Sequence, residues 1–391
     1  MNILHITPYF VPAWYYGGPV QVAYGVSKEL VKRGHKVTVY TTDTLNANGR
    51  IGERKEAIDG IEVKRFRNLS NSIAYSHKIF LSPGMLPAIR KEISSFDIIH
   101  MHEYRTVQNV IVHHYTRKRG IPYILQAHGS LPRTTAKLRL KQVFDAIWGY
   151  QLLEDAARVI ALNETEARQY QAMGARQSKI EIVPNGVDPR EFENIPGRGE
   201  FRKKYGLDGN HRIVLYLGRV HESKGLDLLI RAFASLSREM DSARLVIVGP
   251  DVGYSSELAE LAQDLGTSDK ILFTGPVYER GRLEAYVDAD IFVTPSFLGF
   301  PVTFVEACAC GTPIITTEKS DRLDWLDNHA GLVVAYDENQ LKDALAKVLN
   351  DKDLARLFGE NGKRLVREKF SWSKIAEGLG QIYREAITSY Q

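Results

Sequence analysis

The sequence predicts an α/β fold with two doubly wound domains that face each other across a cleft. Three observations lead to this expectation. Short apolar runs alternate with amphipathic stretches along all 391 residues, which is the pattern of strands that alternate with helices. A turn-rich break at 184–199 separates two such halves. Repeated strand–helix alternation favours parallel sheets covered on both faces, with ligands at the carboxyl ends of the strands.

The expected strands of the first half are short apolar runs with helical patterns between most of them. They are Ile3–Ile6, Lys36–Thr42, Ile61–Phe66, Asp97–Met101, Tyr123–Gln126, Arg158–Ala161 and Ile180–Val183. The first predicted helix places Val22, Val26 and Leu30 on one face and stops at Gly34. A later helix begins at Asn163, a favourable N-cap residue, with Glu166 as its reciprocal partner.

The break consists of Pro184–Pro189 and Pro196–Gly199, both rich in turn-forming residues. Beyond it the alternation restarts with expected strands at Ile213–Leu217, Arg244–Val248, Ile271–Phe273, Ile291–Thr294, Pro313–Thr316 and Leu332–Val334. Three helical stretches close the chain, and the last of them runs from about Trp372 to Ile387. We therefore expect one domain at residues 1–190 and another at 200–370.

The composition is that of a globular chain, with 44% hydrophobic and 25% charged residues. The two cysteines, Cys308 and Cys310, are too few for a disulfide framework, which favours a reducing, cytoplasmic location. Residues 291–317 carry a single charge, Glu306, but prolines and glycines interrupt them. They therefore predict buried core rather than a membrane span. The first residues lack the basic and apolar regions of a signal peptide.

The net charge of +4 is unevenly placed, because the first half is basic and the second acidic. Ordinary surface variation is one interpretation, and an acidic partner is the other. Nucleic acid is not expected, since no aromatic platform is interleaved with the basic residues. One predicted helix carries a basic stripe, Arg133, Lys137 and Lys141, and an apolar stripe, Leu140, Phe144 and Ile147. The apolar stripe either packs on the domain or makes peripheral contact with an anionic membrane, at its inner face.

Two cations follow the first strand of the second half. Arg219 comes two residues after Ile213–Leu217, and Lys224 follows five residues later. Arg219 offers a planar fork of donors and Lys224 a mobile point charge, a combination that suits a diphosphate. Solvated surface charges are the alternative, but the position after a strand favours a binding site.

A second loop, from Pro295 to Pro301, leads into a predicted helix. Gly299 permits a tight turn, and Pro301 starts a helix whose free N–H groups can bind phosphate. Glu306 follows within an apolar run, where a buried carboxylate needs partners. Ribose hydroxyls or a structural arginine would serve.

These residues, in this order, resemble the donor half of glycosyltransferase family 4, whose members have the GT-B fold of two Rossmann-like domains. The second-half motifs are Gly218-Arg219, Lys224-Gly225, Gly299-Phe300-Pro301, Glu306-Ala307 and Cys310-Gly311-Thr312-Pro313. The first-half motifs are Gly17-Gly18, Asp97-Ile98-Ile99-His100, His128-Gly129 and Val183-Pro184-Asn185-Gly186-Val187-Asp188. The closing helix at 371–391 resembles the family's crossover onto the first domain. The resemblance thus covers nearly the whole chain.

The resemblance implies a retaining enzyme that moves a sugar from a nucleotide-diphosphate donor to a glycan or lipid-linked acceptor, in cell-surface polysaccharide biosynthesis. It assigns the donor to residues 200–370 and the acceptor to 1–190 with 371–391. The implied catalytic residues are His128, beside the transferred sugar, and Arg219 and Lys224, on the diphosphate. The implied donor-binding residues are Gly17, Gly18, Arg219, Lys224, Phe300, Pro301, Val302, Thr303 and Glu306, the last on the ribose. A capped strand end is the alternative role for His128, and a plain turn for Gly17-Gly18.

Two patterns imitate metal sites. Asp288 and Asp290 are spaced like the Asp-x-Asp of metal-dependent transferases. They lie between a predicted helix and the strand Ile291–Thr294, however, where the first aspartate is expected to cap or terminate. Cys308 and Cys310 stand two residues apart on a predicted helix, so their side chains diverge by about 200° and cannot bind one ion. We therefore expect no metal and no cofactor.

One position departs from the family. The family's first glutamate, eight residues before Glu306, corresponds to Leu298, and Ser320-Asp321 stand near the place of a frequent Gly-Gly. The first glutamate ordinarily contacts the transferred sugar, so Leu298 favours a donor that is deoxygenated or acylated there. There are three alternatives. Another residue supplies the contact with the sugar, the sugar binds in a rotated position, or the protein is a degenerate GT-B subunit that only binds a nucleotide sugar or partner. A GT-B epimerase or phosphorylase has little support, because no cofactor-anchoring insertion is present.

Overall fold

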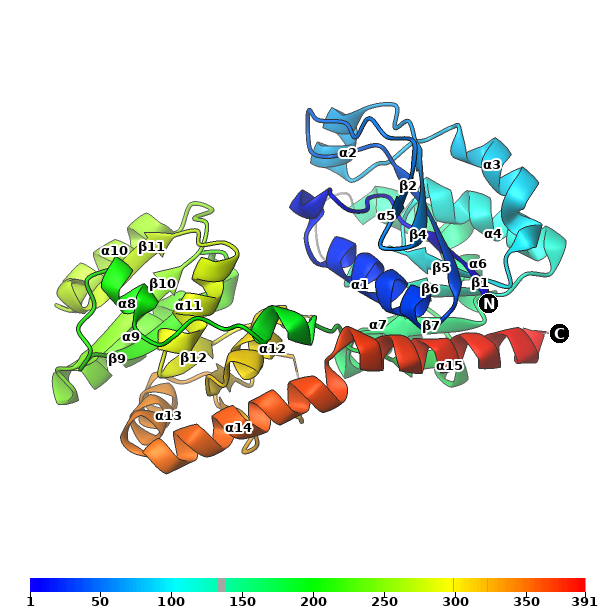
Figure 1. Cartoon of the computed structure of the whole chain (residues 1–391). Helices are drawn as coiled ribbons and strands as arrows, with labels where there is room; N and C mark the ends of the chain where they lie inside the picture. Colours follow the sequence, from blue (N-terminus) through cyan, green and yellow to red (C-terminus); the bar gives the residue numbers. More distant parts are fainter. Residues whose placement is uncertain (133–137, 298, 322, 391) are drawn as a thin grey trace. The chain divides into compact units, whose positions relative to one another are not determined.

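The computed structural model describes residues 1–132, 138–297, 299–321 and 323–390 (Figure 1). The chain forms two compact units, Met1–Asn185 with Trp372–Gln391, and Gly186–Ser371. Each unit is built on one sheet of predominantly parallel strands with helices packed against it. The predicted α/β class with two doubly wound domains is therefore confirmed.

The first unit contains an eight-stranded sheet in the order β3-β4-β2-β1-β5-β6-β7-β8. Its strands are β1 (Asn2–Ile6), β2 (Lys36–Thr42), β3 (Lys55–Ile58), β4 (Ile61–Phe66), β5 (Ile98–His102), β6 (Tyr123–Gln126), β7 (Arg158–Ala161) and β8 (Ile180–Ile182). All neighbours are parallel except β3 and β4, which form an antiparallel hairpin. The hairpin turns at Asp59 and Gly60, both with positive φ, as a two-residue Asp-Gly turn requires.

The helices of the first unit cover both faces of this sheet. They are α1 (Gly18–Lys32), α2 (Asn71–His77), α3 (Met85–Glu92), α4 (Val107–Arg119), α5 (Leu138–Phe144), α6 (Tyr150–Glu154), α7 (Glu164–Ala172) and α15 (Trp372–Tyr390). Apolar residues of α1 and α15 form one core with the sheet, and those of α3, α4, α6 and α7 form a core on the other face. The Asn163 side chain accepts a hydrogen bond from Glu166 N at 2.8 Å, which confirms the predicted N-cap of α7.

The two helices from opposite ends of the chain, α1 and α15, pack against each other (Figure 1). A Cβ atom built on Gly25 of α1 would lie 2.6 Å from the indole ring of Trp372. Such a distance is far below van der Waals contact, so this crossing needs glycine at position 25. The C-terminal helix is thus an integral part of the first unit.

The second unit contains a six-stranded parallel sheet in the order β11-β10-β9-β12-β13-β14. Its strands are β9 (Arg212–Leu217), β10 (Ala243–Val248), β11 (Ile271–Gly275), β12 (Ile291–Thr294), β13 (Ile314–Thr317) and β14 (Gly331–Val334). Its helices are α8 (Glu200–Lys204), α9 (Leu226–Glu239), α10 (Ser255–Asp264), α11 (Arg280–Asp288), α12 (Val302–Cys310), α13 (Glu338–Asn350) and α14 (Lys352–Lys369).

The strand order of each sheet reverses next to its first strand. In the second unit β9 lies between β10 and β12, and in the first unit β1 lies between β2 and β5. Ligands of doubly wound sheets bind where the order reverses, at the carboxyl ends of the strands. Ligands are therefore expected at the loops after β9 and β12, and at those after β1 and β5. No helix in the described part of the chain is long and apolar enough to cross a bilayer.

Candidate functional site

The two cations predicted from the sequence lie on the loop that follows β9. Arg219 is exposed, and its backbone oxygen accepts a hydrogen bond from the Tyr216 hydroxyl at 2.7 Å. Lys224 ends the short helix η6 (Glu222–Lys224) and precedes Gly225, whose φ of 70° leads into α9. Neither cation has a carboxylate within ion-pair distance in the described part of the chain. Both charges are therefore available to an anion.

Lys224 connects the loop after β9 with the loop after β12. Its Nζ lies 4.6 Å from the centroid of the Phe297 ring, and its backbone oxygen accepts a hydrogen bond from Ser296 N at 3.1 Å. Burial, and then the positive charge of Arg219, lowers the pKa of Lys224. A bound anion would oppose both effects, because it stabilises the charged form of the lysine.

The loop after β12 is held by the loop after β13. Phe297 N donates a hydrogen bond to Ser320 Oγ at 3.0 Å, and Asp321 N donates to Phe297 O at 2.9 Å. Gly299 N donates to the Asp321 carboxylate. Ser320 and Asp321, which stand near the place of the family's Gly-Gly, thus have a clear structural role. Leu298 lies outside the described residues.

The N-terminus of α12 presents free backbone donors. Pro301 occupies the N-cap position without a side-chain cap, and the N–H groups of Val302 and Thr303 donate to no other described residue. Free N–H groups at a helix N-terminus favour a bound anion. Phe300, by contrast, is buried and packs against Phe370 with ring centroids 5.7 Å apart. Its ring therefore belongs to the packing of the second unit.

Glu306 has protein partners on both of its oxygens. Its carboxylate, on the second turn of α12, is only 6% exposed; one oxygen forms an ion pair with Arg282, and the other accepts a hydrogen bond from the Tyr286 hydroxyl at 3.2 Å. Burial raises the pKa of Glu306, and the charge of Arg282 opposes this effect. The structure thus contains the structural arginine that the sequence offered as an alternative to ribose. A carboxylate can accept about four hydrogen bonds, so a ribose contact stays a prediction.

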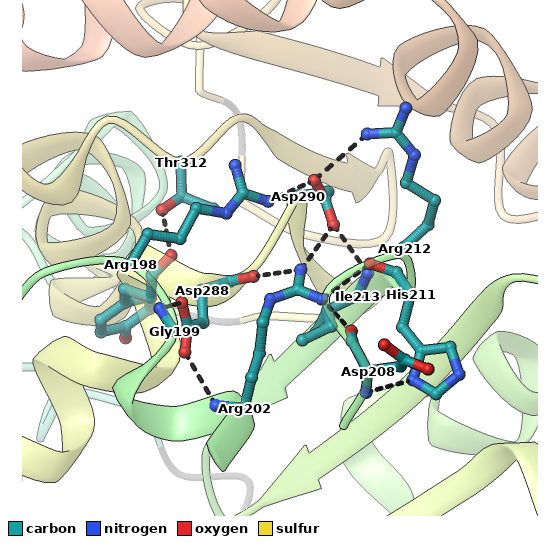
Figure 2. A network of polar contacts seen from close by, with 11 residues as sticks. Arg198, Gly199, Arg202, Asp208, His211, Arg212, Ile213, Asp288, Asp290 and Thr312 are labelled. Carbon is teal, nitrogen blue, oxygen red and sulfur yellow. Dashed lines mark hydrogen bonds and ion pairs between the residues drawn. The ribbon is translucent and has the colours of Figure 1, made fainter. Parts of the chain in front are cut away.

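Figure 2 shows that both aspartates of the Asp-x-Asp pattern have structural partners. Asp288 accepts hydrogen bonds from the backbone N–H groups of Gly199 and Arg202, the latter at 2.8 Å, and so caps α8. Asp290 forms ion pairs with Arg198 at 2.6 Å and with Arg202 at 3.3 Å. Asp288 ends α11 (Arg280–Asp288), as expected, but the helix that its side chain caps is the distant α8 rather than a neighbouring element. The pair stabilises the second unit.

The two glycines predicted after β1 lie at the start of α1. Gly17 has φ 77° and ψ −141°, a conformation that in practice only glycine adopts. Gly18 is the first residue of the helix, and a Cβ on either glycine would meet no atom of the described residues within 4 Å. The backbone is therefore open to a close approach here. Whether phosphate or acceptor makes that approach stays a prediction.

His128 follows β6 in a left-handed conformation with φ 53°, which is uncommon for residues other than glycine. The next residue, Gly129, donates its N–H to Glu166 Oε1 at 2.7 Å and so fixes the turn. His128 Nε2 lies 2.9 Å from His102 Nδ1, and no hydrogen bond to Nδ1 of His128 occurs among the described residues. The half-buried ring thus has one committed nitrogen and one free nitrogen.

Sequence reasoning missed three residues around this turn, which are His5, His102 and Glu103. Glu103 directly follows β5 with φ 66° and accepts a hydrogen bond from the Tyr9 hydroxyl at 2.5 Å. Burial raises the pKa of Glu103 to about 6. The spacing of His100 and His102 was a visible signal, because alternate residues of a strand share one face. Their proximity to His5 depends on the pairing of β1 with β5.

Nitrogen atoms of His5, His100 and His102 lie within 4.8 Å of one another, but in the described arrangement these three imidazoles cannot all bind one ion. A metal ion lies in the ring plane of each imidazole that binds it. The rings of His100 and His102 are stacked with centroids 4.3 Å apart and planes only 16° from parallel, so one ion cannot lie in both planes. Cys308 and Cys310 are free and buried, and burial raises the pKa of both thiols.

Comparison with solved structures shows the fold. A sucrose-phosphate synthase from Thermosynechococcus elongatus has a TM-score of 0.76 at 21% identity, with 100% of both chains covered. HepE from Anabaena, in a complex with UDP and glucose, has a TM-score of 0.74 at 18% identity over 98% of this chain and 100% of that one. Together with the two doubly wound units, these likenesses show the GT-B fold.

The family follows from the sequence comparisons. Residues 197–365 match the family model "Glycosyl transferases group 1", and residues 16–191 match "Glycosyltransferase Family 4". A D-inositol 3-phosphate glycosyltransferase from Nocardia farcinica is 30% identical over 389 residues, with 93% of this chain and 83% of the relative covered. The chain belongs to glycosyltransferase family 4, the group 1 glycosyltransferases, and it transfers a sugar from a nucleotide-sugar donor. The resemblance seen in the motifs is thereby confirmed.

Proposed function

We propose that the protein is a retaining glycosyltransferase that moves a sugar from a nucleotide-diphosphate donor to a glycan or lipid-linked acceptor, in cell-surface polysaccharide biosynthesis, without a catalytic metal ion. One observation supports this most strongly. Arg219 and Lys224 have no carboxylate partner in the described chain, and they share a sheet edge with the free N–H groups of Val302 and Thr303. Fixed cations and a helix N-terminus are what a departing diphosphate needs.

In the proposed reaction the bond between the anomeric carbon and the diphosphate oxygen breaks. A new bond forms between that carbon and the acceptor oxygen, and the acceptor proton passes to the departing phosphate. Arg219 and Lys224 stabilise the charge that develops on the diphosphate, and Glu306 uses its remaining acceptor positions for the ribose. His128 contacts the transferred sugar, and Gly17-Gly18 contact the phosphate or the acceptor. We assign the donor to residues 200–370 and the acceptor to 1–190 with 371–391.

The experiment measures nucleotide-sugar hydrolysis and transfer by the purified protein in EDTA. Arg219→Ala and Lys224→Ala should each lower turnover by about 10²–10³ at unchanged Tm. Lys342→Ala is the matched control, because Lys342 pairs with Glu239 on the exterior of the second unit. Proton NMR of the product reports retention of the anomeric configuration. Full activity of both site variants, or strict dependence on an added divalent ion, would refute the proposal.

A non-catalytic GT-B subunit is the second candidate, and Leu298 is the observation that favours it. Such a protein would bind a nucleotide sugar or a partner without turnover. The same experiment separates the two candidates, because binding without hydrolysis or transfer to any tested acceptor supports the non-catalytic subunit.

We also propose peripheral contact with an anionic membrane, at the cytoplasmic face of the cell membrane. Helix α5 continues through a π-helical turn, Asp145–Gly149, into α6. Leu140 is 64% exposed and Ile147 52% exposed, so this part of the apolar stripe does not pack on the domain. Phe144 lies partly buried against the core, while Arg133 and Lys137 of the predicted basic stripe lie outside the described residues. An exposed apolar surface of this kind is typical of helices that lie in a membrane interface.

A further inference from the structure

Three imidazole rings in the first unit form a continuous hydrogen-bonded chain. His5 lies on β1, His102 on β5, and His128 on the loop after β6, and these strands are neighbours in the sheet. The distance between His5 Nδ1 and His102 Nε2 is 2.9 Å, and that between His102 Nδ1 and His128 Nε2 is also 2.9 Å. His102 thus uses both of its nitrogens, one toward each neighbour.

The rings of this chain meet edge to edge. The ring centroids are 5.1 Å apart for His5 and His102 and 5.2 Å apart for His102 and His128, with interplanar angles of 24° and 6°. Since the nitrogen–nitrogen distances are much shorter than the centroid distances, each hydrogen bond runs along the line that joins two nearly coplanar rings. This is good hydrogen-bond geometry, and it distinguishes the chain from His100, which stacks on His102 face to face.

The three imidazoles of the histidine chain are uncharged near neutral pH. Burial lowers the pKa of His5 and His128 to about 3, and burial together with the neighbouring histidines lowers the pKa of His102. Each neutral imidazole carries one N–H and one acceptor nitrogen. Because His102 can donate only once, both hydrogen bonds must point in the same direction along the chain. Only two arrangements of the protons are therefore compatible with two intact bonds.

The buried end of the chain selects between the two arrangements. Among the residues that the structure describes, His5 Nε2 has no hydrogen-bond partner, although the side chain is fully buried. If the bonds ran from His128 toward His5, this orphan atom would be an N–H donor. If they run from His5 toward His128, it is an acceptor. Orphaned buried N–H donors are rarer than orphaned acceptors, so the second arrangement is favoured.

We propose that His5 and His102 are positioning residues that hold His128 in the Nδ1–H tautomer. In this arrangement His128 Nε2 accepts from His102, and the free Nδ1 carries a proton that it donates to a hydroxyl oxygen of the transferred sugar. The contact with the sugar rests on the function proposed for His128. The tautomer itself rests only on the chain, and it exists before any ligand binds.

The direct test is long-range proton–nitrogen NMR of the ligand-free protein with labelled histidines, with the His128 signals assigned by their loss in His128→Gln. The expected result is a single Nδ1–H tautomer for His128. In His102→Gln, whose amide reaches only toward His5, His128 should revert to a mixture of tautomers. Wild-type His128 in the Nε2–H tautomer, or a tautomer unchanged in His102→Gln, would overturn the proposal.

Turnover supplies a second readout. Two variants of His102 differ in the nitrogen that they replace, because an asparagine amide lies where a histidine has Nδ1 and a glutamine amide lies where a histidine has Nε2. His102→Asn can still donate to His128 and should stay within a few-fold of wild type. His102→Gln should lose about ten- to hundredfold in kcat/KM, the cost of one misdirected hydrogen bond. If His102 had only a packing role, His102→Gln would keep more turnover than His102→Asn, because glutamine is closer to histidine in volume. That result would contradict the proposal.

His113→Asn is the matched control. His113 is a buried histidine that contacts Asp155 and does not belong to the chain of His5, His102 and His128. The variant should leave both the His128 tautomer and turnover unchanged. Full turnover of His128→Gln would refute the contact of His128 with the sugar. The expected tautomer in the wild-type protein would still confirm the ordered histidine chain. The failure of the proposed function and the failure of the chain are thereby distinguishable.

Discussion

Replacement of Arg282 by methionine should destabilise the second unit through a buried charge rather than through lost packing. Methionine retains much of the apolar stem of arginine, but it leaves Glu306, a residue only 6% exposed, with Tyr286 as its remaining partner among the described residues. Removal of one partner of a buried ion pair costs about 3–5 kcal/mol. The Arg282 side chain is 23% exposed, so we expect a loss of about 3 kcal/mol, at the low end of that range.

The loss should depend on pH, with a sign that follows from Glu306. Burial already raises the pKa of Glu306 above its ordinary value in the folded protein, and without Arg282 the pKa rises further. A carboxyl group whose folded pKa lies above its unfolded pKa favours folding when it is protonated. The deficit of Arg282→Met should therefore shrink as the pH falls from above the folded pKa toward the unfolded value near 4.5.

The assay is urea unfolding followed by circular dichroism at neutral and mildly acidic pH. Glu306→Gln, added to Arg282→Met, removes the orphaned charge and should recover most of the lost stability. Arg280→Met is the control on the same helix; the Arg280 side chain is 60% exposed in its pairs and should cost less than about 1 kcal/mol. A double variant as unstable as Arg282→Met alone, or a deficit that does not change with pH, would show that the unpaired charge of Glu306 is not the cause.

Three further outcomes are expected. Leu298→Glu should improve turnover of an ordinary hexose donor and impair turnover of a deoxy or acylated one, by about ten- to hundredfold. If the wild-type protein already turns over an ordinary hexose donor efficiently and Leu298→Glu only lowers that turnover, the prediction is wrong. Sedimentation should show stronger binding to anionic than to neutral vesicles, lost in Leu140→Ser with Ile147→Ser, and equal binding to both vesicle types would argue against membrane contact. Gly25→Ala should lower Tm measurably because its methyl group meets Trp372; an unchanged Tm would mean that α15 shifts freely.

Most of the fold could be predicted because parallel strands are buried on both faces and so appear as apolar runs. The strand β3 was missed, since Lys55–Ile58 is polar, short and at the sheet edge. Its signal was the Asp59-Gly60 dipeptide, a typical two-residue hairpin turn. A strand that gains its stability from one neighbour and a turn leaves little trace in hydrophobic periodicity.

The site divides in the same way between local and tertiary features. Arg219, Lys224 and the start of α12 follow strands directly, so their shared sheet edge could be predicted from chain order. The partner of Glu306 could not, because Arg282 comes from a helix whose packing is a tertiary property. The histidine chain also could not be predicted from the sequence, because it depends on the register of β1 with β5 and on the left-handed turn at His128.

Arg219, Lys224 and the N-terminus of α12 are expected to bind a nucleotide diphosphate without a metal ion. Calorimetric titration of UDP, GDP and ADP in EDTA tests this expectation most directly. At least one of these nucleotides should bind the wild-type protein in EDTA, and Lys224→Ala should weaken that binding at least tenfold, which corresponds to about 1.4 kcal/mol. Binding that appears only with added divalent metal, or an affinity unchanged by Lys224→Ala, would contradict the account.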